Sequence, residues 1–257
     1  MGKIISIHSF RGGTGKSNLC ANLAAQAALA GYRVGIVDTD IQSPGIHVIF
    51  GLDEKKMGPT VNDFLHGKAT VEQVAYPVGE VAHQQAGLQK LSGKSLWLFP
   101  SSIDAGEISR IIKQGYDFNM LNSGLQGMLR GMKLDYLFID THPGLNDETL
   151  LSIAVSDILL VVLRPDQQDF QGTAVTVTVA QSLDVPDLNL VVNKALTKYD
   201  LNQVRQEVEE KYHVPVAGVL PLTEDMADLG SSDLFSLCYP DHPWSRCLRD
   251  VAQVILR

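Results

Sequence analysis

Residues 9 to 18 read SFRGGTGKSN and follow an apolar run. Gly12, Gly13 and Gly15 let the backbone turn so that its N–H groups point at phosphate oxygens. Lys16 would then contact the β- and γ-phosphates, and the Ser17 hydroxyl would bind Mg²⁺. The stretch departs from the common G-x-x-x-x-G-K-[ST] motif because Phe10 replaces the first glycine. A glycine-rich turn with an incidental lysine is the alternative, and the flanking elements argue against it.

Polar side chains follow three further apolar runs. VDTDIQSPG carries Asp38 and Asp40, FIDTHPG carries Asp140, and LNLVVN ends in Asn193. The carboxylates suit a magnesium site, and an asparagine amide could read an adenine edge through paired hydrogen bonds. Singly, each is equally well a helix cap or a turn former. Their joint appearance after successive runs favours one nucleotide site.

These loops need a scaffold, and the apolar runs indicate one. We predict strands at 3–9, 33–38, 95–100, 134–140, 157–163, 188–193 and 214–221, with helices at about 16–30, 106–130, 168–183 and 200–212. Strands of nearly continuous hydrophobicity are typical of a sheet covered on both faces. The alternation predicts an α/β fold with a doubly wound, mostly parallel sheet, which binds ligands at the carboxyl ends of its strands. Residues 51–94 are more polar, and we predict a surface insertion with a short helix near TVNDFLHG.

The composition excludes several classes. The chain has 257 residues, 45% hydrophobic and 19% charged, with 29 acidic against 21 basic residues and a formal net charge of −8. That balance argues against a surface that is basic throughout, although a local basic patch is compatible with it. Cys20, Cys238 and Cys247 form neither a disulfide framework nor a C-x-x-C pair, which favours a reducing cytoplasm and buried thiols. We find no targeting signal and no apolar run of the roughly 20 residues that a membrane span needs.

Taken together, these motifs resemble those of the ParA/MinD family of deviant Walker A ATPases, whose loop reads K-G-G-x-G-K-[ST] where this chain has RGGTGKS. VDTDIQSPG, YLFIDTHPG and VVNKA are similar to the family's aspartate loop, Walker B strand and base-binding strand end. The likeness extends through RPDQQDFQGTAVTV and GVLPLTEDM and covers nearly the whole chain except 51–94. It implies a P-loop NTPase fold in a single domain, 1–257, with ATP and Mg²⁺ as cofactors.

The resemblance also implies residue roles. Asp40 would orient the attacking water, and Lys16 and Arg11 would act on the phosphates. Asp38, Asp140 and Ser17 would support the metal. The nucleotide would be bound by Gly12, Gly13, Thr14, Gly15, Lys16, Ser17, Asn18, Asn193 and Pro221. Family members form an ATP-dependent homodimer that dissociates after slow hydrolysis.

Arg11 stands where the family has a lysine that reaches the partner's ATP. A guanidinium keeps the charge but is longer, planar and forked. It would act in trans or, alternatively, pair with an acidic residue of its own chain. For His142, a turn role is favoured over contact with the γ-phosphate. Phe10 is expected to pack beside the loop.

The resemblance leaves the biological role open. We expect an ATPase switch that positions or partitions a cargo under an unknown stimulating partner; the alternative is a nucleotide-gated regulatory module with little hydrolysis. The terminal stripe of Trp244, Leu248, Val251 and Ile255 indicates a core-facing helix, with no further segment as a membrane anchor. Nonspecific DNA binding stays open, because the basic residues of the C-terminal part lie among acids. Iron–sulfur carriers share the fold, but no cysteine pair here has their spacing.

Overall fold

The computed structural model describes residues 2–53, 57–80, 84–114 and 118–257. Eight strands in these ranges form one sheet in the order β3-β4-β2-β5-β1-β6-β7-β8. The strands are β1 (Lys3–His8), β2 (Val34–Asp38), β3 (Tyr76–Pro77), β4 (Leu96–Phe99), β5 (Tyr136–Asp140), β6 (Ile158–Leu163), β7 (Asp187–Ala195) and β8 (Val216–Pro221). All neighbours pair in parallel except β3, which is antiparallel to β4. The predicted strands and the parallel sheet are confirmed.

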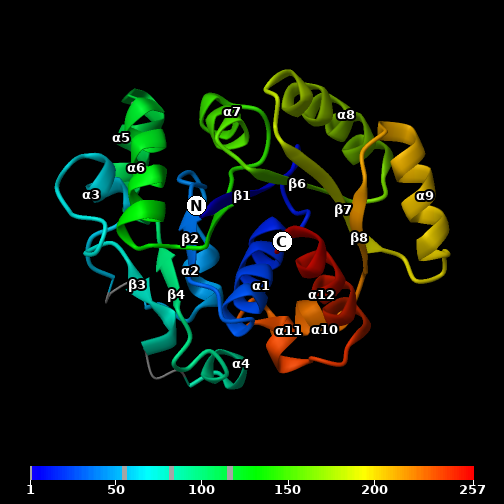
Figure 1. Ribbon diagram of the computed structural model, residues 1–257, viewed down its shortest axis with the longest axis horizontal. Helices are drawn as coiled ribbons and strands as arrows, with labels where there is room; N and C mark the ends of the chain where they lie inside the picture. Colours follow the sequence, from blue (N-terminus) through cyan, green and yellow to red (C-terminus); the bar gives the residue numbers. More distant parts are fainter. Residues whose placement is uncertain (1, 54–56, 81–83, 115–117) are drawn as a thin grey trace.

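The helices lie on both faces of the sheet (Figure 1). They are α1 (Lys16–Leu29), α2 (Ile46–Ile49), α3 (Val61–Leu65), α4 (Ala86–Gln89), α5 (Ala105–Gln114), α6 (Phe118–Gly131), α7 (Asp147–Ala154), α8 (Gln167–Ser182), α9 (Leu201–Tyr212), α10 (Glu224–Leu229), α11 (Phe235–Cys238) and α12 (Pro243–Ile255), with a 3-10 turn, η2, at Val78–Glu80. Residues 106–130, expected as one helix, contain parts of both α5 and α6; residues 115–117 lie outside the described ranges.

Consecutive strand residues point to opposite faces and build separate cores. Ile36 and Phe138 pack with α1 and α12 in the largest cluster, whereas Val37 and Ile139 belong to a second cluster with α3 and α6. A third cluster joins β6, β7 and β8 to α8 and α9. Strands buried on both faces explain the unbroken apolar runs of the sequence.

The C-terminal helix α12 packs beside α1 on one face (Figure 1). Trp244, Leu248, Val251 and Ile255 are all buried, as their spacing predicts. This apolar stripe therefore belongs to the core. Among the described residues, no helix has the length and apolar character needed to cross a membrane.

Residues 51–94 contain α3 at the predicted short helix, capped by a box between Thr60 and Asp63. The stretch also supplies β3 at the edge of the sheet and buries Val61, Val74 and Leu88. It therefore contributes to the core as well as to the surface.

Candidate nucleotide site

The loop between β1 and α1 has the backbone of a phosphate cradle. Gly13 and Gly15 have φ angles of 76° and 92°, a region that side chains disfavour. A Cβ at Gly15 would also lie 2.6 Å from Asn193 Nδ2. Helix α1 then begins at Lys16 without a side-chain cap at Gly15, so its first N–H groups face the loop. A helix start of this kind attracts anionic oxygens.

Other segments hold this loop in place. The Ser9 hydroxyl donates to the Arg11 carbonyl at 2.6 Å, and the Thr14 hydroxyl donates to Ser9 Oγ at 3.1 Å. The Gly144 N–H, from the segment after β5, donates to the Ser9 carbonyl at 3.1 Å. The Lys194 ammonium donates to the Gly13 carbonyl at 2.8 Å. The loop is thus shaped before any ligand binds.

Asn193 braces the same loop from the end of β7. Its Nδ2 donates to the Thr14 carbonyl at 2.8 Å, while its Oδ1 accepts from the Lys194 N–H at 2.9 Å and from Trp244 Nε1 at 3.5 Å. Both ends of the amide are therefore engaged within the protein. These bonds give Asn193 a structural part in the loop. Its Nδ2 has a second N–H, and Asn193 also lines the cavity beside the loop, so a hydrogen bond to adenine stays a prediction.

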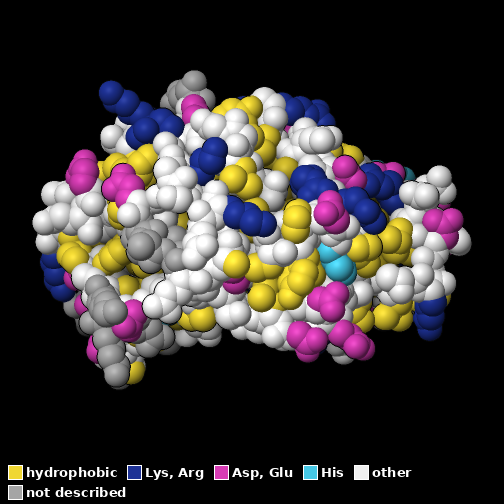
Figure 2. Space-filling model, turned by 90° about the horizontal axis from the view of Figure 1, so that it is seen from below, with side chains coloured by type: hydrophobic (Ala, Val, Ile, Leu, Met, Phe, Trp, Pro, Cys, Tyr) yellow, Lys and Arg dark blue, Asp and Glu magenta, His cyan; other side chains and the backbone are white. Residues whose placement is uncertain are grey.

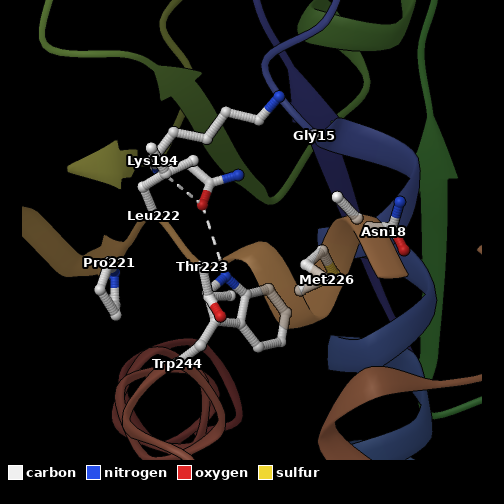
Figure 3. Close-up of a pocket in the computed structure, with 10 residues that line it drawn as sticks. Gly15, Asn18, Lys194, Pro221, Leu222, Thr223, Met226 and Trp244 are labelled. Carbon is white, nitrogen blue, oxygen red and sulfur yellow. Dashed lines mark hydrogen bonds between the residues drawn. The ribbon is translucent and has the colours of Figure 1, made fainter. Parts of the chain in front are cut away.

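A cavity of about 260 Å³ opens beside the loop (Figure 3). It is lined by Gly15, Asn18, Asn193, Lys194, Pro221, Leu222, Thr223, Met226, Ala227 and Trp244. The predicted Asn18, Asn193 and Pro221 come together here. Leu222, Met226 and Trp244 were missed as lining residues, although Trp244 was placed in the core. Their apolar surfaces suit the faces of a flat ring, and the adjoining loop suits phosphates.

Three carboxylates meet at the carboxyl edge of the sheet. Asp38 and Asp140 are paired in the β2–β5 register, and both are buried. Asp38 accepts from the N–H groups of Asp40 and Gly45 at 2.9 and 3.2 Å. Two buried acids placed side by side favour binding of a cation.

The pKa values report this crowding. Burial raises the pKa of Asp140 to about 6, with Asp40 adding to the rise and both the Ser17 hydroxyl and Lys16 opposing it. Burial also raises the pKa of Asp38 well above its usual range. Burial lowers the pKa of Lys16, against the attraction of Asp140 and Asp40. The site thus holds charges that a phosphate and a metal ion would balance.

The residues present fit a magnesium ion. Asp140 Oδ1 is buried and has no hydrogen-bond partner within the described ranges, and the Ser17 hydroxyl bonds to the same carboxyl group. Hydroxyl and carboxylate oxygens are the donors that Mg²⁺ prefers, together with water and phosphate. Among the described residues, no group of three or more His, Cys, Asp or Glu side chains is placed to hold a metal ion. A magnesium ion here would therefore also need hydroxyl, water and phosphate oxygens.

Asp40 lies two residues beyond the end of β2, and its side chain contacts His142. The Asp40 Oδ1 and His142 Nδ1 atoms are 2.7 Å apart, and the Ser43 N–H donates to the same Oδ1 at 3.1 Å. His142 therefore does more than fill the turn after β5. Sequence reasoning had no signal for this pairing, because the two residues are 102 positions apart.

Arg11 lies against the start of α8. Its Nη1 donates to Gln168 Oε1, and its Nε lies 4.0 Å from Asp169 Oδ1. Asp169 is already engaged by Arg164, whose Nε lies 3.0 Å from Oδ2. The Arg11 side chain stays 40% exposed. Phe10 packs beside the loop as expected, its ring lying over Gly172 of α8.

The sheet order, the glycine loop with Lys16 and the carboxylates at one edge define a P-loop nucleotide-binding protein. Residues 5–237 match the family described as the CobQ/CobB/MinD/ParA nucleotide-binding domain, and the chain belongs to this family. It is a P-loop ATPase domain of the MinD/ParA superfamily, with arginine at the first loop position.

Solved structures share the fold across nearly the whole chain. The septum site-determining protein MinD from Pyrococcus horikoshii, complexed with Mg-ADP, has a TM-score of 0.81 and 21% identity, covering 99% of this chain and 96% of that one. MinD in the MinC:MinD cell division complex of Aquifex aeolicus has a TM-score of 0.81 at 20% identity, covering 99% and 96%.

The relatives found by sequence carry other names than the solved structures. An uncharacterised ATP-binding protein of Methanocaldococcus jannaschii is 26% identical over 98% of this chain and 87% of its own length. An iron–sulfur cluster carrier protein of Rickettsia conorii is 29% identical over 88% of this chain and 63% of its own length. Proteins named iron–sulfur cluster carriers thus stand among the relatives to which this chain is similar.

Proposed function

We propose that this protein is a magnesium-dependent ATPase that dimerises when it binds ATP and returns to monomers after slow hydrolysis. One observation carries the proposal. The loop that holds Lys16 is locked to Asn193, and it faces Asp38, Asp40 and Asp140 at the same edge of the sheet. Phosphate binding, metal binding and water orientation need these groups together.

In this proposal the base and ribose of ATP occupy the cavity near Trp244, and the phosphates lie on the N–H groups of residues 12–17. Lys16 neutralises charge on the β- and γ-phosphates. Ser17, Asp38 and Asp140 would hold Mg²⁺, which supplies electrostatic stabilisation of the transferred phosphoryl group. Asp40 accepts a hydrogen bond from the attacking water and so aligns it with the γ-phosphorus.

Arg11 would supply a cation to the partner's ATP. Its exposure and its 4.0 Å separation from an Asp169 already held by Arg164 support this role, since no close ion pair neutralises the guanidinium within its own chain. The competing role is a purely intrachain contact with Gln168. If that role holds, Arg11→Ala leaves dimerisation unchanged; in the trans role it abolishes the ATP-dependent dimer, and Arg11→Lys restores it in part.

The decisive experiment is the solution mass of Asp40→Ala protein, by chromatography coupled to light scattering, with Mg-ATP and with Mg-ADP. Loss of the water-orienting carboxylate should trap the ATP state. A dimer in ATP and a monomer in ADP supports the switch. A monomer in both, with ATP bound, contradicts it and favours the nucleotide-gated regulatory module.

The proposed switch positions or partitions a cargo in the cytoplasm under a stimulating partner. DNA is one candidate surface. On the face shown in Figure 2, lysine and arginine side chains lie among acidic ones. Of the C-terminal cations, Lys194, Arg205 and Arg249 donate to carbonyl groups within the chain. A mobility shift that needs ATP and fades with salt would support DNA binding; no shift directs the search to protein surfaces. The apolar face of α12 is buried in the core, so we propose no membrane contact through that helix, and co-sedimentation with liposomes in ATP would overturn this.

Iron–sulfur cluster carriage is the second candidate, favoured by the names of the curated relatives. The thiols here are poorly prepared for it, since cluster ligands are thiolates. Cys20 is fully buried, and burial together with Asp233 raises the pKa of Cys238 to about 11. Anaerobic reconstitution with iron and sulfide tests the idea. Stoichiometric cluster binding that is lost in a Cys238→Ser, Cys247→Ser double variant would replace the partitioning role by carriage.

A further inference from the structure

The Asp40 carboxylate is held on one side by two donors from different segments. His142 Nδ1 lies 2.7 Å from Oδ1, and the Ser43 N–H donates to that oxygen at 3.1 Å. Within the described part of the chain, Asp40 Oδ2 forms no hydrogen bond, while the Asp40 N–H is fixed by Asp38 Oδ1 at 2.9 Å. The backbone and one oxygen are thus anchored, and the other oxygen is left for a ligand.

Such anchoring matters because a carboxylate rotates about its terminal torsion with broad, nearly two-fold preferences. A free carboxylate would sample orientations in which neither oxygen points at the water. The bond to His142 selects one orientation, and both side chains are largely shielded, 21% and 16% exposed. A carboxylate oxygen accepts hydrogen bonds, so the contact with Oδ1 needs the Nδ1–H tautomer of His142.

We propose that His142 is a positioning residue for Asp40: its Nδ1–H fixes Oδ1, so that Oδ2 is aimed at the attacking water. This inference rests on the proposed ATPase function. It adds that hydrolysis depends on the orientation of the Asp40 carboxylate, which His142 sets. In the step it serves, the water oxygen bonds to the γ-phosphorus and the bond to the β–γ bridging oxygen breaks. ADP leaves, and phosphate and a proton are the other products. His142 takes no proton in this step.

Side-chain replacement separates positioning from packing. An Asn side chain places its Nδ2 donor near the position of His Nδ1, whereas Ala and Gln do not. We expect single-turnover hydrolysis to fall about 10- to 100-fold in His142→Ala and His142→Gln, as misalignment of a reacting group does. His142→Asn should keep the rate within about threefold of wild type. ATP affinity should change less than about twofold in all three, because the bond acts on the water and not on the nucleotide.

A double variant shows whether the effect passes through Asp40. Once Asp40→Ala has removed the carboxylate, adding His142→Ala should lower the rate no further. His66→Asn, on the exposed end of α3, is the matched histidine control and should behave as wild type. An undiminished rate in His142→Ala, an equal loss in the Ala and Asn variants, or additive losses in the double variant would overturn the proposal.

A readout independent of turnover keeps the two proposals apart. In the ¹⁵N spectrum of histidine-labelled protein without nucleotide, His142, assigned by its loss in His142→Ala, should be the Nδ1–H tautomer. Asp40→Ala should shift that signal. If wild type fails to hydrolyse ATP but the tautomer is found, the ATPase proposal fails and the pair remains. If wild type hydrolyses ATP and His142 carries its proton on Nε2, only the positioning role is rejected.

Discussion

Asn193 and Thr14 are 179 residues apart in sequence and are joined by a 2.8 Å hydrogen bond from Nδ2 to the backbone carbonyl. This bond ties the end of β7 to the phosphate loop, and the close approach of Gly15 leaves no room for another side chain between them. The nucleotide site therefore depends on β7, a strand that is distant in sequence from the glycine-rich motif before Lys16.

Asn193→Ala should weaken ATP binding about tenfold, because the loop would lose its brace and the ligand would have to order it. The free energy of unfolding should fall by about 1–3 kcal/mol, since the buried Thr14 carbonyl loses its donor. Titration calorimetry and urea denaturation measure both. Asn202→Ala, on the exposed face of α9, is the control, and equal affinities in the two variants would contradict the bracing role.

Gly172 of α8 and Phe10 of the phosphate loop form a second contact that couples a helix to the loop. A Cβ at Gly172 would lie 2.2 Å from a ring carbon of Phe10. Gly172→Ala should therefore destabilise the fold by about 1–3 kcal/mol and disturb the loop, although alanine favours helices. In Phe10→Gly protein the same substitution should be neutral or stabilising, because that variant removes both the ring and the Phe10 Cβ, which would lie 2.7 Å from the new side chain. Thermal unfolding of the four proteins completes the cycle; additive effects would show that the two residues do not meet.

His8 should make stability depend on pH. Burial, with Lys16 and His142 nearby, lowers its pKa from 6.5 to about 3. Between those values the unfolded chain binds a proton that the folded chain does not. Stability is therefore present above pH 6.5 and is lost as the pH falls toward 3, by at most about 1.4 kcal/mol per pH unit from this residue.

The pH dependence of the free energy of unfolding also includes Asp140, whose raised pKa acts in the opposite direction. The contribution of His8 is therefore isolated by comparing wild type with a His8 variant. His8→Asn keeps a donor for Thr141, which His8 contacts at 2.8 Å, and does not titrate. Urea midpoints at several pH values should show wild type losing stability faster than His8→Asn as the pH falls. Parallel curves would mean that His8 binds its proton equally well in the folded and the unfolded protein, so that folding does not lower its pKa.

Asp140→Asn should stabilise the protein without nucleotide at neutral pH. The pKa of about 6 means that ionising this buried carboxyl costs the folded state free energy above that pH, of the order of 1–3 kcal/mol. The difference should vanish below about pH 4, where the acid is protonated in both states. With saturating Mg-ATP the order should reverse if Asp140 holds the metal as proposed, because the variant would lose that ligand. Melting temperatures in the presence and absence of Mg-ATP test this, and a variant that is less stable in both conditions would refute it.

The sheet and the phosphate loop were predictable because their signals are local. Continuous apolar runs mark strands covered on both faces, and the glycines before Lys16 mark a backbone that few other residues adopt. The contacts that complete the site leave no such signal. The helical spacing of Trp244 predicts burial equally well with or without a nucleotide cavity, and the His142–Asp40 pair forms only because β2 and β5 are neighbours. The short β3, Tyr76–Pro77, is fixed by pairing with β4, and two residues are too few to show a strand pattern in the sequence.

The central position of β1 has a consequence for how the protein is made. Lys3 is in register with Tyr136, and Ile5 with Ile158. The first strand of the chain can therefore pair only after β5 and β6 have been synthesised. During synthesis the phosphate loop emerges early and is among the last segments to be set, once β7 brings Asn193 to it. Contacts so distant in sequence slow folding and leave an apolar strand uncovered in the meantime. Nucleotide would thus bind only to chains that have folded through β7, and it would stabilise the completed fold selectively over its precursors.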